Sequence, residues 1–124
     1  MHFLSVEEVI TLHESIIQPH ELQGLARDKS IESTIARIDN RLAYGMIKDV
    51  FELAACYAAY IATAHAFNDA NKRTAFAAMD NCLALNGIRL PYDTTIAGDM
   101  IRSVAQGVKD EFQLADWLRR LHSR

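Results

Sequence analysis

Residues 50–85 read VFELAACYAAYIATAHAFNDANKRTAFAAMDNCLAL, and this stretch decides the fold. Its first part, residues 50–64, is apolar nearly all round, which is typical of a helix buried at the centre of a domain. Its last part, from about Asn71 to Asn86, is rich in alanine and predicts a second helix that can approach the first closely. The segment between them, His65 to Arg73, holds a histidine, an aspartate, two asparagines, a lysine and an arginine. Packing alone does not explain so polar a junction.

Two helices are predicted before this stretch, from apolar residues that recur at helical spacing. Ser5 and Glu8 form a capping box that starts the first of them. The second begins after Asp28 or Ser30 and ends at Gly45. Further along the chain, another cap, at residue 49, is predicted for the central apolar helix.

Two more helices are predicted after it. Thr94 or Thr95 is the expected cap of the fifth helix, whose apolar stripe runs to Val108, and the sixth helix places Trp117 in the core. Residues 88–90 are at most a short extended piece. The sequence therefore predicts an all-α fold of about six helices in one domain, residues 1–124, with two central helices joined by the polar segment.

The composition is that of an ordinary globular protein, with 50% hydrophobic and 23% charged residues. A formal net charge of -3 argues against a broad basic surface for nucleic acid. The N-terminus lacks the pattern of a signal peptide, and Glu52 interrupts the longest apolar run, so neither secretion nor a membrane span is predicted. Cys56 and Cys82 lie in apolar helical runs without metal-ligand spacing, which indicates buried thiols in the reducing cytoplasm.

The polar segment has the chemistry of a phosphate site. A loop that enters a helix N-terminus offers free backbone N–H groups to an anion. Lys72 and Arg73 fall in the first helical turn, where cations are unfavourable unless an anion is bound. His65 is suited to general-base catalysis, because imidazole takes up protons near neutral pH. Asp69 suits a hard cation such as Mg²⁺, or alternatively a helix N-cap.

The segment HAFNDANKR closely resembles the signature of Fic-domain proteins, H-x-F-x-[D/E]-G-N-G-R. Within that group it is most similar to the Doc branch, the toxins of small toxin–antitoxin modules, whose length and helical order also suit this chain. The resemblance implies that His65 accepts the proton of a target hydroxyl, that Phe67 anchors the loop in the core, and that Asp69 holds Mg²⁺. It further implies that ATP is bound by Asn68, Asn71, Lys72 and Arg73, and that Lys72 and Arg73 are catalytic together with His65 and Asp69. Asn71 is equally suited to bracing the loop.

Two departures from the signature favour phosphoryl transfer over transfer of AMP. Ala70 and Lys72 replace the two glycines, and Lys72 takes the space that nucleotide phosphates use in AMP-transferring members. In Doc-like members this replacement goes with a reoriented nucleotide that presents its γ-phosphate. Phe76 stands where many nucleotidyl transferases carry a further arginine.

By resemblance, the acceptor is a threonine hydroxyl of translation elongation factor Tu, whose modification stops translation. The implied partner is a Phd-type antitoxin, whose C-terminal segment folds as a helix on the toxin near the first two predicted helices. Arg37, Arg41 and Lys48 are candidates to face the polar loop and to contact the target. Three alternatives stay open: an AMP-transferring Fic protein, a catalytically inert co-repressor that only binds its antitoxin, and a purely structural helical protein.

Overall fold

The computed structural model describes residues 1–27 and 29–123, which form six helices and no strand. The predicted all-α fold with two central helices is confirmed. The helices are α1 (Val6–Ile16), α2 (Ile31–Ala43), α3 (Val50–Ala64), α4 (Asn71–Leu85), α5 (Thr94–Ala105) and α6 (Glu111–His122).

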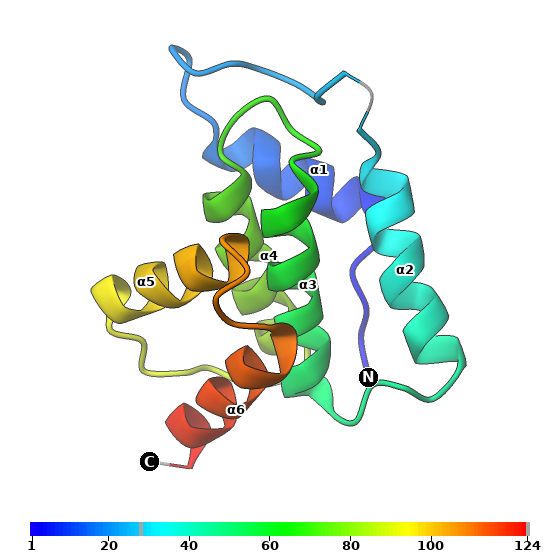
Figure 1. Cartoon of the computed structure of the whole chain (residues 1–124), viewed down its shortest axis with the longest axis vertical. Helices are drawn as coiled ribbons and strands as arrows, with labels where there is room; N and C mark the ends of the chain where they lie inside the picture. The colour runs from blue at the N-terminus through cyan, green and yellow to red at the C-terminus, as the bar shows by residue number, and fades with distance from the viewer. Residues whose placement is uncertain (28, 124) are drawn as a thin grey trace.

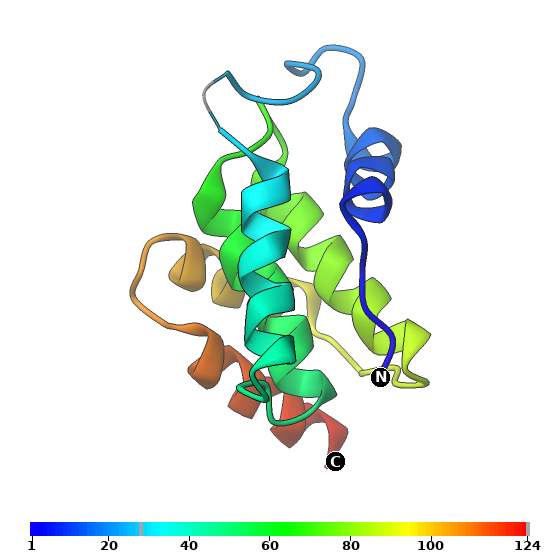
Figure 2. The same cartoon turned by 90° about the vertical axis from the view of Figure 1, so that its right-hand side faces the viewer.

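The central helix is α3, which packs against α2, α4, α5 and α6 (Figure 1). It is buried without interruption from Glu52 to Ala59, as its apolar surface predicts. α4 returns alongside it, and its small residues Ala75 and Ala78 are fully buried. α1 packs against α4 and α2, and Figure 2 shows it on the α4 side of the molecule. The C-terminal end of α1 lies beside the loop that joins α3 to α4, because His13 in its last turn contacts the carbonyl of Asp69.

The start of each helix follows from local capping chemistry, with one exception. The predicted caps Ser5, Ser30 and Asp49 all accept the backbone hydrogen bond expected of them. Asp28, the alternative cap for α2, lies outside the described residues. Among the six described helices, only α4 begins without a side-chain cap, at Ala70.

The C-terminal region corrects three expectations. Asp93, and not Thr94 or Thr95, caps α5, because its carboxylate already accepts from the N–H of Ile96. α5 ends at Ala105, so Val108 does not continue the apolar stripe and is exposed. Trp117 is only partly buried at the edge of the core.

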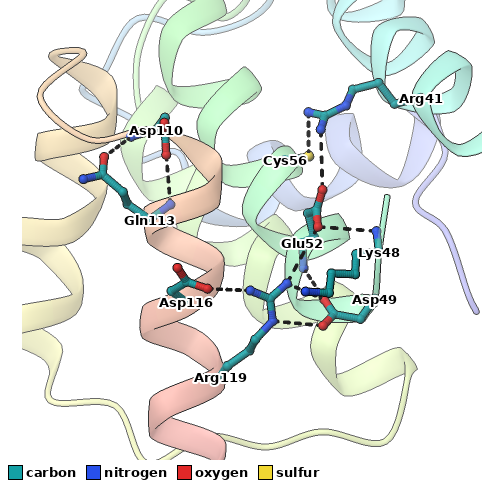
Figure 3. A network of polar contacts seen from close by, with 9 residues as sticks. All are labelled: Arg41, Lys48, Asp49, Glu52, Cys56, Asp110, Gln113, Asp116 and Arg119. Carbon is teal, nitrogen blue, oxygen red and sulfur yellow. Dashed lines mark hydrogen bonds and ion pairs between the residues drawn. The ribbon is translucent and has the colours of Figure 1, made fainter. Parts of the chain in front are cut away.

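A network of ion pairs ties α2, α3 and α6 together at the end of α3 farthest from the polar loop (Figure 3). Arg41 donates to the Tyr60 hydroxyl at 2.7 Å and pairs with Glu52 and Glu111. Arg119 donates to Asp49 through two nitrogens, at 2.9 and 3.1 Å. Arg41 therefore serves the fold and does not face the loop.

The other two candidates for target contact lie beside different parts of α3. Arg37 stacks over the ring of Tyr60, 4.5 Å from its centroid, and Lys48 precedes the cap of α3. Lys48, at the far end of α3, does not face the polar loop, whereas Arg37 lies beside Tyr60 in the last turns of α3 before that loop.

Both cysteines are buried and free, as predicted. Burial raises the pKa of each thiol to about 12, so neither is ionised near neutral pH. Within the described residues, no helix combines the length and the apolarity needed to cross a bilayer.

Candidate functional site

The polar loop of residues 65–70 is bounded by two residues in the left-handed conformation. His65 ends α3 with φ 52°, and Ala70 precedes α4 with φ 63°. This backbone costs a non-glycine residue roughly 1–2 kcal/mol. It persists only where the surroundings hold it, and such strain gathers at functional sites.

One set of contacts comes from the segment between α1 and α2. The N–H of Ala26 donates to the carbonyl of Ala66 at 2.7 Å, and the N–H of Asn68 donates to the carbonyl of Gly24 at 3.0 Å. The side-chain amide of Asn68 also donates to the carbonyl of Gln23 at 2.7 Å. The loop therefore pairs with residues 23–26 as a short piece of antiparallel backbone, and the Asn68 amide is used in that pairing.

Asn71 braces the loop from the α4 side. Its Oδ1 accepts from the N–H of Phe67 at 3.2 Å, and its Nδ2 donates to the carbonyl of Phe67 at 2.9 Å. Of the two roles that the sequence leaves open for Asn71, the geometry shows bracing. The Phe67 ring is buried, 2% exposed, so it anchors the loop as expected.

A third contact, which sequence reasoning missed, comes from α1. His13 is 2% exposed, and its ring stacks on that of Phe67 with centroids 3.9 Å apart and planes 7° apart. Its Nε2 lies 2.9 Å from the backbone oxygen of Asp69. The available signal is that His13 interrupts an otherwise apolar helical stripe, which gives no indication of its partner 56 residues away.

The start of α4 carries the features of an anion site. Its first intrahelical bond runs from the N–H of Thr74 to the carbonyl of Ala70, so the N–H groups of Asn71, Lys72 and Arg73 precede the ladder. Asp69 does not act as the cap. Its Oδ1 accepts from the N–H of Ala70, at 2.8 Å.

A polar cavity of about 250 Å³ opens over this helix end. The His65 side chain is exposed at its edge, and the exposed Lys72 shares the cavity with it. The structure thus brings together all the residues for which the sequence suggests catalysis or nucleotide binding. The cavity is lined by Ala62, His65, Asn68, Asp69, Ala70, Asn71, Lys72 and Arg73.

The cavity has one carboxylate, that of Asp69. Across residues 1–27 and 29–123, no group of three histidine, cysteine or acidic side chains is placed to hold a metal by itself. This donor set fits Mg²⁺, which keeps several waters and is bound by one or two carboxylates together with phosphate oxygens.

Arg73 already has an anionic partner. Its guanidinium pairs with the Glu21 carboxylate, and this contact holds the pKa of Glu21 below its ordinary value. The sequence gives no sign of the pair, because 52 residues separate its members.

Lys72 and Arg73 also border a second, apolar groove of about 550 Å³ between α4 and α5. Gly98 lines the α5 side of this groove, and Ile16 lines it at the end of α1.

Comparison with known proteins identifies the family. The model of the Fic/DOC family matches residues 3–83, more than half of the chain, and the chain belongs to this family. Over 123 residues it is 37% identical to the protein kinase Doc of Escherichia phage P1, and the match covers 98% of this chain and 97% of that protein. The similarity therefore extends beyond the loop and through α5 and α6.

Proposed function

We propose that this protein is a Doc-like toxin that transfers the γ-phosphate of ATP to a threonine hydroxyl of elongation factor Tu and so halts translation in the cytoplasm. The observation that carries the proposal is the uncapped start of α4, which opens into a cavity shared by His65, Asp69 and Lys72.

The phosphates of ATP would lie against the first turn of α4. Its free N–H groups and the helix dipole favour negative charge there. Lys72 supplies a mobile point charge and Arg73 a planar fork, and both can follow charge onto the transferring group. Positioning and charge neutralisation then provide most of the rate.

Asp69 would hold Mg²⁺ against the phosphate oxygens, as the donor set of the cavity allows. Bound there, the ion would neutralise charge that develops on the phosphates. The Oδ1 of Asp69 accepts the N–H of Ala70, which fixes the direction of the carboxylate.

His65 would act as the general base. As the threonine oxygen forms its bond to the γ-phosphorus, the bond from that phosphorus to the β–γ bridging oxygen breaks and ADP leaves. The proton of the hydroxyl passes to His65. The exposed position of His65 suits an acceptor carried on a second protein, because the hydroxyl can approach from solvent.

The partner would be a Phd-type antitoxin. The sequence points to the first two helices as its landing surface, whereas the apolar groove lies between α4 and α5 and reaches α1 at Ile16. An amphipathic helix laid in this groove would place its acidic residues beside Lys72, Arg73 and Arg102.

The test is incubation with elongation factor Tu and ATP labelled on either the α- or the γ-phosphate. Label from the γ-phosphate alone is the expected result, and His65→Ala, Asp69→Asn and Arg73→Ala should each lose it. Arg120→Ala, an exposed arginine on α6, is the matched control for Arg73→Ala and should keep its activity. Label from the α-phosphate would indicate AMP transfer instead. Absence of label from either phosphate would contradict any transferase activity toward this substrate.

Growth distinguishes the co-repressor alternative. Expression of the wild type should arrest cells, and His65→Ala should relieve the arrest. Equal harmlessness of both proteins, with antitoxin binding retained, would identify an inert co-repressor.

A further inference from the structure

The proposed reaction leaves a buried histidine unused. The contacts of His13 with Phe67 and with the carbonyl of Asp69 link α1 directly to the residue that would hold Mg²⁺. A carbonyl oxygen can only accept a hydrogen bond, so the Nε2 of His13 carries the proton and donates it.

This donation completes the restraint of one peptide group. The N–H of Ala70 is held by Asp69 Oδ1 at 2.8 Å, and the carbonyl of the same peptide, on Asp69, is held by His13 at 2.9 Å. Rotation of the peptide would change ψ of Asp69 and φ of Ala70 together. Both ends must be released before Ala70 can leave φ 63°.

The two hydrogen bonds on the peptide group between Asp69 and Ala70 act against the backbone strain at Ala70. An alanine in the left-handed region gains free energy by leaving it. If it left, the bond from Thr74 N–H to the Ala70 carbonyl, 2.9 Å long, would lose its geometry, and the Asp69 carboxylate would turn with its backbone.

We propose that His13 is a positioning residue: its hydrogen bond to the Asp69 carbonyl keeps Ala70 left-handed and the Asp69 carboxylate aimed into the cavity. The inference rests on the proposed function, in which Asp69 is the Mg²⁺ ligand. The Phe67 backbone is held without His13, because the Asn71 side chain makes hydrogen bonds to both its N–H and its carbonyl.

Two substitutions of similar shape separate the hydrogen bond from packing. His13→Gln keeps a donor at about the same reach, whereas His13→Met fills similar space without one, and both remove the stacked ring. We expect kcat of His13→Met to fall about tenfold to a hundredfold, as for other residues that orient a metal ligand. We expect His13→Gln to stay within about threefold of the wild type. Equal loss in the two variants would overturn the proposal.

Amide hydrogen exchange tests the same point without catalysis. The Thr74 N–H should exchange about tenfold faster in His13→Met than in His13→Gln, while the N–H of Ala58 at the centre of α3 reports global stability in both. Unchanged Thr74 exchange in His13→Met would also overturn the proposal. This readout still operates if the wild type shows no kinase activity, so failure of the function and failure of the restraint are distinguishable.

A second substitution, at Ala70, should offset the effect of His13→Met. Glycine has no penalty at φ 63°, so His13→Met should do little harm in a protein that already carries Ala70→Gly. The double variant should exchange the Thr74 N–H more slowly than His13→Met alone, and its kcat should be close to that of Ala70→Gly alone. Additive effects of the two substitutions would show that His13 does not act through the Ala70 backbone.

Discussion

At the scale of single residues, His65 and Ala70 combine a strained backbone with a place in the cavity. They are the non-glycine residues with positive φ in the described part of the chain, and they stand at the two ends of one loop. Glycine is common at the left-handed position that ends a helix, and His65 occupies it here. A side chain kept at a conformational cost is better explained by chemistry than by folding.

His65→Gly should therefore stabilise the fold while it abolishes activity. Release of the left-handed penalty, partly offset by the entropy of glycine, should raise the free energy of unfolding by about 0.5–1 kcal/mol. Urea denaturation measures the gain. His65→Ala, which keeps the strain, should be equally inactive without becoming more stable. A His65→Gly protein less stable than the wild type would mean that the imidazole supports the fold.

Glu21→Gln should strengthen ATP binding, because the Glu21 carboxylate occupies the guanidinium that we assign to phosphate. An exposed ion pair contributes little free energy, so its removal should lower the KM for ATP by only about two- to fivefold. Since Arg73 lowers the pKa of Glu21, the competition persists into mildly acid solution. Glu14→Gln, at an exposed position of α1, is the control. A higher KM in Glu21→Gln would show instead that the pair orients Arg73 for binding.

Much of the candidate site is predictable from the sequence because its residues are consecutive. His65, Asp69, Lys72 and Arg73 reach one cavity through a single loop and one helical turn. Their supports could not be predicted in this way. His13, Glu21 and Gly24 lie 44 to 56 residues upstream of their partners. No local spacing encodes these contacts, which form when α1 and the segment after it pack against the loop and α4.

At the scale of elements, helix starts were predictable wherever one side chain satisfies a nearby N–H. Ser5, Ser30 and Asp49 are such cases. The cap of α5 was misplaced by one or two residues because Asp93, Thr94 and Thr95 are all good caps in a row, and only the backbone geometry selects among them. The absent cap of α4 is visible only once its loop is in place.

α5 offers a prediction of its own, because Gly98 lies inside the helix and lines the apolar groove. A Cβ at Gly98 would lie 3.6 Å from an Arg102 nitrogen, an ordinary contact. Gly98→Ala should therefore raise the free energy of unfolding by about 0.5–1 kcal/mol. Gly107→Ala is the control and should destabilise, since φ there is +76°. Loss of stability in Gly98→Ala would show that α5 cannot accept the added methyl group.

At the scale of the whole molecule, the ion-pair network joins parts that are far apart in the sequence. Asp49 caps α3 and also pairs with Arg119 of α6, 70 residues away. Burial by itself raises the pKa of Asp49, but the hydrogen bonds from Arg119 and from the N–H of Glu52 outweigh it and lower the pKa below its ordinary value.

A carboxyl group with a lowered folded-state pKa stabilises the protein above its unfolded pKa, and the stabilisation is lost as the pH falls through the folded value. Asp49→Asn keeps the cap but removes the charge. It should cost about 1 kcal/mol at pH 7. The difference from the wild type should shrink below about pH 4. Urea denaturation across this range measures it. Asp116→Asn, 61% exposed, should change little. If the difference in stability between the wild type and Asp49→Asn does not change with pH, the ion pair between Asp49 and Arg119 is not its cause.

The placement of the chain ends has a practical consequence. The N-terminal segment is tied to the far end of α4 through hydrogen bonds between His2 and Asn86, and α6 also ends on that side, away from the polar loop (Figure 1). A fluorescent fusion, an affinity tag or a surface tether at either terminus would therefore leave the polar cavity at the start of α4 free. Assays with immobilised protein can then test whether the proposed protein substrate reaches this cavity.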